Sequence, residues 1–156
     1  MGLEEAKRYL EERGYGDRVK VFDVSSATVE LAAIAVGTEP EKIAKSLTFM
    51  VDDRPVMILC AGDAKINNSK YKACFQKKAK MLSREQVNEL VGHDVGGVCP
   101  FGRKEGVDVY LDESLKRFEV VYPACGSGNS AVELNLEELE ALSDCKGWID
   151  VCKIPE

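Results

Sequence analysis

Residues 46–60 read SLTFMVDDRPVMILC. The runs 46–51 and 55–60 are apolar and β-rich, and the polar triplet 52–54 separates them. Two such runs joined by a short polar turn are typical of a β-hairpin. The sequence therefore predicts that residues 46–60 form a β-hairpin.

The segments on both sides of the hairpin mix helical and strand patterns. Helical spacing or capping residues predict helices over 4–13, 28–37, 39–41, 83–90 and 136–142. In the second of these helices, we expect Leu31, Ile34 and Ala35 to face inward. Apolar or alternating runs predict further strands over 19–24, 107–111, 118–122, 131–134 and 148–151. Because strands come in clusters rather than in strict alternation with helices, we expect one α+β domain over residues 1–156, with a mixed, mainly antiparallel sheet surrounded by helices.

Length and composition agree with one globular domain and exclude several classes of protein. The chain has 156 residues, 45% of them hydrophobic, and a net charge of −6, so it is not a non-specific polyanion binder as a whole. No apolar run approaches the length of a membrane span, and the first residues lack the features of a signal peptide. We therefore expect a cytoplasmic protein without a membrane partner.

Cysteine usage favours free thiols. The six cysteines form no CxxC pair, and His93 is the only histidine that could join them in a zinc site. Nothing marks a secreted, disulfide-bonded chain. We expect reduced thiols in a reducing cytosol, and neither a metal nor a cofactor.

Two glycine-rich segments are candidates for a ligand site. Residues 96–102 read GGVCPFG, residues 125–130 read CGSGNS, and each lies beside a predicted strand. Glycine permits positive φ and close backbone approach, so such loops can present bare N–H groups to a ligand oxygen or a polarised carbonyl. Each could also be an ordinary surface turn or hairpin loop. Together, the two segments could line one concave site.

Three single residues in or near these segments could take part in chemistry. Lys45 lies between a short helical segment and the hairpin, where it could be a solvated lysine or a cation that pairs with a phosphate or a developing oxyanion. His93 has the pKa class of a general base, and Cys99 could be a nucleophile. Since no Cys–His arrangement can be recognised from the sequence, we expect a polar loop histidine and a loop or pocket cysteine.

Residues 64–84 form a basic segment in an acidic chain, because they hold seven Lys and Arg residues and no Asp or Glu. A charge run is usually a solvated face, but segregation of sign within an acidic protein also indicates a docking surface for a phosphate backbone. Tyr71 and Phe75 within it could stack on a base or belong to the core. The candidate nucleic-acid contacts are Lys65, Lys70, Lys72, Lys77 and Lys78.

Three segments in consistent order resemble the YbaK/EbsC family. Residues 36–47 (VGTEPEKIAKSL) are similar to its helix–Lys–strand segment, residues 95–102 (VGGVCPFG) to its GxxxP-bearing loop, and residues 122–134 (YPACGSGNSAVEL) to its second glycine loop and the following strand. The resemblance covers roughly residues 21–151. The family includes free-standing trans-editing aminoacyl-tRNA deacylases and the editing domain inserted in bacterial prolyl-tRNA synthetase.

The resemblance implies a curved or barrel-like mixed sheet, no metal, and hydrolysis of an ester at the tRNA 3′ end. It implies catalytic roles for Lys45, Gly96 and Gly97. Lys45 would bind the terminal adenosine's phosphate or ribose, or stabilise charge near the ester, and the loop from Gly96 to Pro100 would place the scissile carbonyl and a water. The implied substrate-binding residues are Thr28, Val98, Cys99, Pro100, Phe101, Gly126, Ser127, Gly128, Asn129 and Ser130.

The resemblance also implies partners and leaves one alternative open. The expected partner is an aminoacylated tRNA, foremost tRNA-Pro or a similar tRNA carrying a small amino acid such as Cys or Ala, together with prolyl-tRNA synthetase or another synthetase. Cysteine-specific members commonly carry an aromatic residue where Thr28 aligns and an Asp where Ala131 aligns, and the inserted domains use a histidine near the second glycine loop. These departures favour the alternative, a non-catalytic module that binds a tRNA 3′ end, a nucleotide or a protein on the same scaffold.

Overall fold

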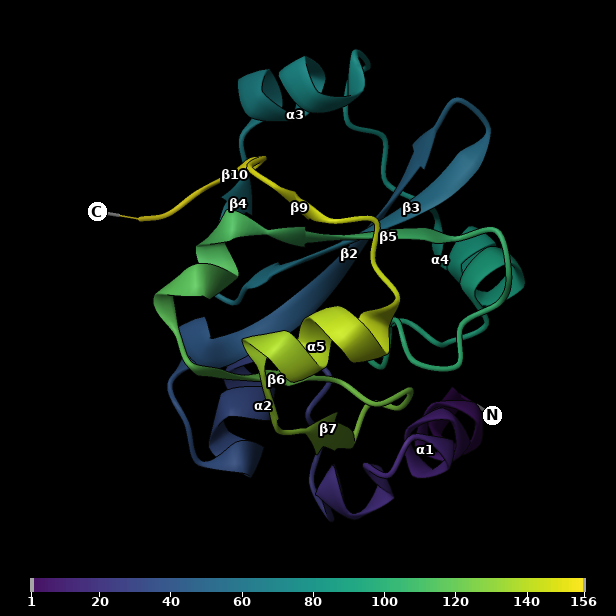
Figure 1. Cartoon of the computed structure of the whole chain (residues 1–156), viewed down its shortest axis with the longest axis vertical. Coiled ribbons are helices and arrows are strands. Elements are labelled where there is room, and N and C mark those ends of the chain that lie inside the picture. Colours follow the sequence, from purple (N-terminus) through teal and green to yellow (C-terminus); the bar gives the residue numbers. More distant parts are fainter. Residues whose placement is uncertain (1, 156) are drawn as a thin grey trace.

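A six-stranded mixed sheet organises the chain, with helices packed around it (Figure 1). The computed structural model describes residues 2–155. The sheet has the strand order β8-β6-β2-β3-β5-β9, and β1 with β7 and β4 with β10 form two small ladders beside it. The strands are β1 Val19–Val21, β2 Ile43–Val51, β3 Arg54–Ala61, β4 Lys65–Ile66, β5 Asp108–Asp112, β6 Val120–Pro123, β7 Ser130–Val132, β8 Leu134–Asn135, β9 Trp148–Ile149 and β10 Cys152–Lys153.

Five α-helices and several shorter helical turns connect the strands. The α-helices are α1 Gly2–Glu12, α2 Val29–Val36, α3 Asn68–Phe75, α4 Arg84–Gln86 and α5 Leu136–Ser143. The 3-10 turns are η1 Gly16–Arg18, η2 Pro40–Lys42 and η4 Glu113–Arg117, and the π-helical turn η3 Val87–Val91 continues α4. The capping box of Ser83 and Gln86 is present at the start of α4, as its sequence predicts.

The predicted hairpin is β2 and β3, which pair antiparallel from Ala44↔Ala61 to Val51↔Arg54. Asp52 and Asp53 both have positive φ, 47° and 67°, which the two-residue hairpin turns that match strand twist require. Residues 57–61 of β3 are fully buried. The hairpin is thus the centre of the sheet and of the core.

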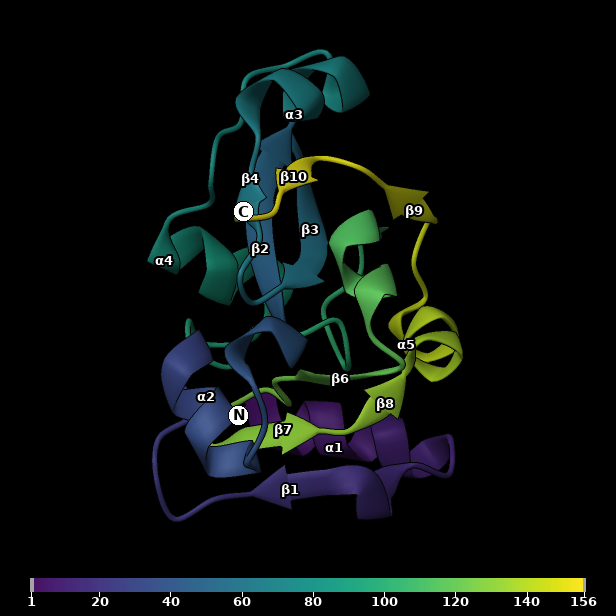
Figure 2. The same ribbon diagram turned by 90° about the vertical axis from the view of Figure 1, so that its left-hand side faces the viewer.

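The α+β class and the mixed sheet are confirmed. Within the six-stranded sheet, β2–β3 and β6–β8 are antiparallel and β2–β6, β3–β5 and β5–β9 are parallel, so this sheet is mixed but not mainly antiparallel. The two small ladders, β1–β7 and β4–β10, are antiparallel. Figure 2 shows α3 and α1 at opposite ends of the molecule, with α2 and α4 on one side of the hairpin and α5 on the other. No helix within residues 2–155 combines the length and the apolar character that crossing a membrane requires.

Tyr71 and Phe75 belong to the aromatic core rather than to an exposed stacking surface. Tyr71 is fully buried, and its ring lies 5.1 Å from that of Phe49 and 4.9 Å from that of Phe75, centroid to centroid. Phe75 also meets the Tyr110 ring edge-on at 5.5 Å. These contacts attach α3 to the hairpin and to β5.

The predicted inward face of α2 is wrong. Thr28 caps the helix and Gly37 ends it in a left-handed conformation, as expected, but the buried residues are Ala32 and Ala33. Leu31 is 41% exposed and Ile34 76% exposed. The alanines pack with Ile43 of β2, where small side chains let the short helix approach the strand closely.

Candidate functional site

A pocket of about 300 Å³ lies between the start of α2, strand β2 and the first glycine segment. Most of its walls are small or branched apolar side chains, and six residues with a hydroxyl group, five Ser or Thr and one Tyr, lie among them. The lining residues are Ser26, Ala27, Thr28, Val29, Ala32, Ile43, Ala44, Lys45, Ser46, Leu47, Thr48, Met81, Leu82, Val87, Val95, Gly96, Val98, Tyr122, Ala124, Ser130 and Ala131. Such a pocket suits a small, largely uncharged group.

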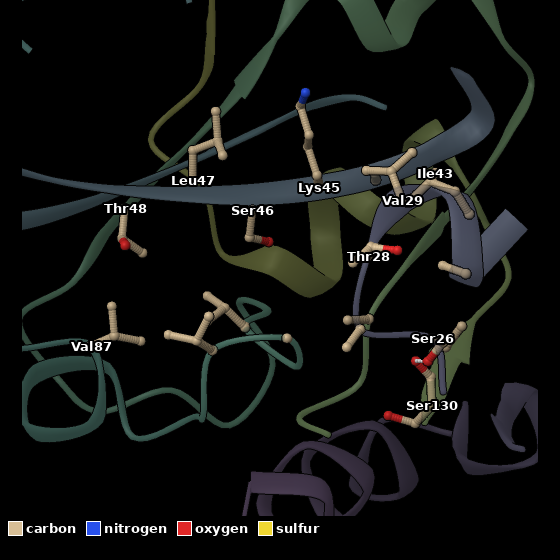
Figure 3. Close-up of a pocket in the computed structure, with 18 of the residues that line it drawn as sticks. Ser26, Thr28, Val29, Ile43, Lys45, Ser46, Leu47, Thr48, Val87 and Ser130 are labelled. Carbon is tan, nitrogen blue, oxygen red and sulfur yellow. Dashed lines mark hydrogen bonds between the residues drawn. The ribbon is translucent and has the colours of Figure 1, made fainter. Parts of the chain in front are cut away.

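Strand β2 divides its side chains between two faces at the pocket. Because successive strand residues point to opposite faces, Ser46 and Thr48 lie on one side and Lys45 and Leu47 on the other. Figure 3 shows Ser46 and Thr48 directed toward the side on which Val87 lies, and Lys45 directed away from them. Ser46 and Thr48 were not singled out from the sequence, although their spacing of two in a predicted strand places them together.

The ammonium group of Lys45 is held by backbone carbonyls. It donates to the carbonyl oxygen of Gly62 at 3.2 Å and to that of Ala64 at 2.5 Å, in the turn between β3 and β4. Lys45 is therefore a lining residue whose side chain extends to the other face of β2, where its charge meets this turn (Figure 3). Its catalytic role remains a prediction, which needs the ammonium to exchange these carbonyls for substrate oxygens.

The short helix η4 holds the turn that binds Lys45. The backbone N–H of Ala61 donates to Ser114 Oγ at 3.0 Å, and Arg117 pairs with both carboxylate oxygens of Asp63, at 3.1 and 2.5 Å. The hydrogen bond from Arg117 lowers the pKa of Asp63. These contacts with η4 fix the backbone of the turn whose carbonyls accept from Lys45.

The two glycine segments touch each other, but they do not line the pocket equally. The N–H of Gly126 donates to the carbonyl of Gly97 at 2.9 Å, and a Cβ on Gly97 would overlap the backbone at Gly126 and Ser127. Ala27 lies against both segments, 3.2 Å from where a Cβ of Gly96 would stand and 3.4 Å from that of Gly128. The second glycine segment therefore packs against the backbone of the first glycine segment and holds it in place.

The predicted site residues separate into two groups. Of those named from the sequence, the pocket is lined by Thr28, Lys45, Gly96, Val98 and Ser130. The structure does not place the others on the pocket wall, because they are buried behind it or lie in the supporting loop: Gly97, Cys99, Pro100, Phe101, Gly126, Ser127, Gly128 and Asn129. Phe101 in particular is fully buried, 6.2 Å from the Tyr9 ring, so its expected contact with substrate is replaced by a core contact.

Backbone donors at the first glycine segment differ from those expected. The N–H of Gly97 donates to the Asp94 carbonyl at 3.0 Å and so closes a turn. The N–H groups of Gly96 and Val98 take part in no hydrogen bond among residues 2–155, and both residues line the pocket. Among the loop residues that line the pocket, Gly96 and Val98 thus keep unpaired N–H groups, the kind of donor that a substrate carbonyl needs.

A Cys–His pair that could not be recognised from the sequence is present but inert. Cys99 Sγ lies 3.6 Å from His93 Nε2, and His93 Nε2 is also 2.8 Å from the Phe101 carbonyl. Burial raises the pKa of Cys99 well above its usual value and lowers the pKa of His93. Both groups lie buried in the core and away from the pocket, and the raised pKa keeps Cys99 a neutral thiol, so neither is placed to act on a ligand there as nucleophile or general base.

Thiol labelling tests this assignment. Cys74 is exposed and Cys145 half-buried, whereas Cys60, Cys99, Cys125 and Cys152 are buried. Burial raises the pKa of Cys125 to about 12. We expect an alkylating reagent at neutral pH to modify Cys74 first and the buried four only after denaturation, as measured by mass spectrometry. Rapid labelling of Cys99 in the native protein would contradict the inert pair.

The basic segment is exposed, but two of its predicted contacts are already paired. Lys70 binds Asp150 at 3.0 Å, and Lys77 binds Asp52 at 3.2 Å. Lys65, Lys72 and Lys78 are exposed and have no ion-pair partner within residues 2–155. The segment then runs along β2, where the N–H of Met50 donates to the Lys80 carbonyl at 2.9 Å, and it reaches the pocket at Met81 and Leu82. Lys78 and Lys80, which we call the basic strip, thus precede the point where the chain reaches the pocket at Met81.

The fold and the site together define an α+β domain with a small apolar pocket between a braced lysine and a glycine-rich backbone loop. The chain belongs to the aminoacyl-tRNA editing domain family, whose model matches residues 24–142.

Comparisons with individual proteins support the assignment of the chain to this family. The chain is 49% identical to the uncharacterized protein YwhH of Bacillus subtilis (strain 168), over 98% of both chains. It is 33% identical to the proline–tRNA ligase of Geobacillus sp. (strain WCH70) over 69% of this chain, which spans 19% of that ligase. A crystal structure of a proposed trans-editing enzyme for prolyl tRNA synthetase superposes with a TM-score of 0.87 at 29% identity, covering 97% of both chains.

Proposed function

We propose that this protein is an aminoacyl-tRNA deacylase that acts on mischarged tRNA in trans. The observation that carries the proposal is the apolar pocket of about 300 Å³, which is lined by Gly96 and Val98, two residues whose N–H groups make no hydrogen bond within residues 2–155. Family membership and the likeness to a proposed trans-editing enzyme support the same reaction. Its place of action would be the cytoplasm, where aminoacyl-tRNA is made.

In this reaction the protein supplies position and electrostatic stabilisation. The side chain of the misacylated amino acid enters the apolar cavity, and the N–H groups of Gly96 and Val98 donate to the ester carbonyl oxygen. Water attacks the carbonyl carbon, the bond to the ribose oxygen breaks, and the proton lost by the water ends on that ribose oxygen. Lys45 neutralises negative charge on the adenosine phosphate or on the developing oxyanion.

We infer that the substrate is tRNA-Pro or a similar tRNA bearing a small amino acid, such as Cys or Ala. The matched segments of proline–tRNA ligases support this tRNA, and the small pocket supports the amino acid. A separate hydrolytic sieve is physically reasonable, because a single binding step separates side chains that differ by a methylene only by about 10–200-fold. Prolyl-tRNA synthetase is the expected source of the mischarged tRNA.

Single-turnover deacylation of a panel of mischarged tRNAs tests the proposal. We expect the purified protein to accelerate hydrolysis of at least one small aminoacyl ester well above its spontaneous rate. Equal rates with and without protein for every ester would contradict it.

A non-catalytic binding module is the second candidate, and one observation favours it. The Lys45 ammonium is already bound by two carbonyls, and no Asp, Glu or His is among the residues that line the pocket. Binding of tRNA without acceleration of ester hydrolysis would decide for this candidate.

Salt dependence tests the basic strip as the tRNA contact. We expect Lys78→Ala with Lys80→Ala to weaken tRNA binding and to reduce the slope of log Kd against log salt by about 0.7–0.9 for each lost phosphate contact. The double change Lys7→Ala with Arg8→Ala removes the same charge from exposed positions on α1, at the other end of the molecule, and should change the slope less (Figure 2). An equal slope for the two double variants would rule out the strip.

A further inference from the structure

The ammonium group of Lys45 is bound by neutral oxygens, although a carboxylate lies next to them. Its acceptors are the carbonyls of Gly62 and Ala64, and Asp63 lies between these two residues in the chain. The pKa of Asp63 is lowered first by the hydrogen bond from Arg117 and also by the positive charge of Lys45. The carboxylate is thus close enough to attract the ammonium, yet the two form no ion pair.

Arg117 of η4 occupies both oxygens of this carboxylate. Its Nη1 and Nη2 atoms donate to Oδ2 and Oδ1 of Asp63, at 3.1 and 2.5 Å. Its Nε donates to the Ser114 carbonyl at 3.0 Å, and its guanidinium carbon lies 4.8 Å from the centre of the Phe118 ring. A planar guanidinium matches a carboxylate with two parallel bonds, which an ammonium group cannot do. These contacts orient the arginine toward Asp63.

The backbone on both sides of this ion pair is fixed by other contacts. A Cβ on Gly62 would overlap the carbonyl oxygen of Pro40, so the turn packs tightly against η2. On the side of η4, the buried Asp112 accepts from the N–H of Ser114 at 2.9 Å and caps that helix. Removal of the Arg117 charge should therefore change the partner of the carboxylate rather than the path of the chain.

A carboxylate partner would change what the Lys45 ammonium can do. Carbonyl oxygens are neutral, so an ammonium bound to them keeps its net charge and can exchange them for a substrate phosphate or a developing oxyanion. A carboxylate would instead cancel that charge, and the substrate would have to displace a full negative charge from the ammonium. The partner of Asp63 therefore determines whether Lys45 can serve the substrate.

We propose that Arg117 is a positioning residue of the deacylase: by binding both oxygens of Asp63, it keeps this carboxylate from pairing with Lys45 and leaves the ammonium able to reach the substrate. The proposal rests on the deacylase function above and adds a residue that acts on the site without touching the substrate. It differs in one respect from a role in stability alone. The loss of Arg117 slows the reaction only while residue 63 carries a negative charge.

A double-mutant cycle tests this dependence. Single-turnover rates are measured for the mischarged ester that the wild-type protein hydrolyses fastest. We expect Arg117→Gln to slow the reaction about tenfold, the effect of one hydrogen bond between charged groups, and the double variant with Asp63→Asn to recover the rate of Asp63→Asn alone. A wild-type rate for Arg117→Gln would overturn the proposal. So would a double variant, or Asp63→Asn alone, that is as slow as Arg117→Gln.

Two further variants control for the loss of charge and for folding. Lys116→Gln removes the same charge from the neighbouring residue of η4, whose exposed ion pair with Glu113 is 2.9 Å long, and should keep the wild-type rate. Equal slowing by Lys116→Gln and Arg117→Gln would overturn the proposal. Arg117→Lys keeps a cation but loses the two parallel bonds, so its rate should be intermediate. If melting curves show that Arg117→Gln does not fold, Arg117→Lys replaces it in the cycle with the same expected recovery.

A crystal structure of Arg117→Gln supplies a measurement that does not depend on activity. We expect Lys45 Nζ to lie within about 4 Å of an Asp63 carboxylate oxygen, the range of an ion pair, while the backbone of Gly62 and Ala64 stays in place. An unchanged Lys45, with the carboxylate turned to solvent, would overturn the proposal and leave the deacylase function standing. If the wild-type protein accelerates no ester of the panel, the deacylase function fails, and this structure still decides whether Arg117 separates the two charges.

Discussion

Replacing Lys45 with alanine is expected to lower the single-turnover rate of deacylation at least about 100-fold. A cation that stabilises charge developing at the ester or on the adjacent phosphate is worth about 3 kcal/mol, because the pocket is largely apolar. Removing it also costs stability, since the two hydrogen bonds from the ammonium to the carbonyls of Gly62 and Ala64 are lost, at about 1.5–3 kcal/mol each. Rapid-quench measurement of amino acid release, with a melting curve for each variant, checks both values.

Two further variants separate charge from packing at Lys45. Lys45→Met keeps the length of the stem and removes the charge, so it should be as slow as Lys45→Ala. Lys20→Ala removes a charge from exposed strand β1, outside the pocket, and should react at the wild-type rate. A folded Lys45→Met protein with wild-type rates would refute the catalytic role of the ammonium group.

Introducing a side chain at Gly97 is expected to damage both stability and activity. A Cβ there would overlap the backbone of Gly126 and Ser127, which cannot move as a flexible side chain could. We expect Gly97→Val to lower stability by about 2–3 kcal/mol, the upper range for overpacking, and the melting temperature by about 4–10 °C. Deacylation should fall as well, because separation of the two segments displaces Gly96 and Val98.

Gly128→Ala is the matched control for Gly97. Gly128 lies in the second glycine segment, but a Cβ there would meet only the Ala27 side chain, at an ordinary 3.4 Å. We expect its melting temperature to change far less than that of Gly97→Val. Equal losses for both variants would show that the close approach at Gly97 is not what holds the segments together.

Local sequence signals predicted the elements of this fold better than their faces and partners. The hairpin 46–60, the capping box at Ser83 and the helix after Asn135 rest on contacts within a few residues, and all three are confirmed. The buried face of α2 depends instead on which strand lies beside it. The larger apolar residues Leu31 and Ile34 suggested one face, but the close approach to β2 selects Ala32 and Ala33.

At the candidate site, too, the sequence predicted which residues take part better than it predicted their tertiary contacts. The sequence, with the family resemblance, led to Thr28, Lys45, Gly96, Val98 and Ser130, which the structure brings to one pocket. It could not show that the Lys45 ammonium turns to the β3–β4 carbonyls, or that Cys99 meets His93 in the core, because both contacts depend on tertiary packing. The hydroxyl pair of Ser46 and Thr48 was readable from strand alternation alone.

The central claim is that this pocket hydrolyses the ester of mischarged tRNA, and one comparison tests it most directly. Amino acid release is measured under single-turnover conditions from tRNA-Pro charged with a small non-cognate residue and from correctly charged prolyl-tRNA-Pro. We predict that the protein accelerates release of the non-cognate residue at least about 100-fold over spontaneous hydrolysis and spares the prolyl ester, because a hydrolytic sieve must leave the correct product intact. Equal rates with and without protein, for every small residue tried, would contradict the account.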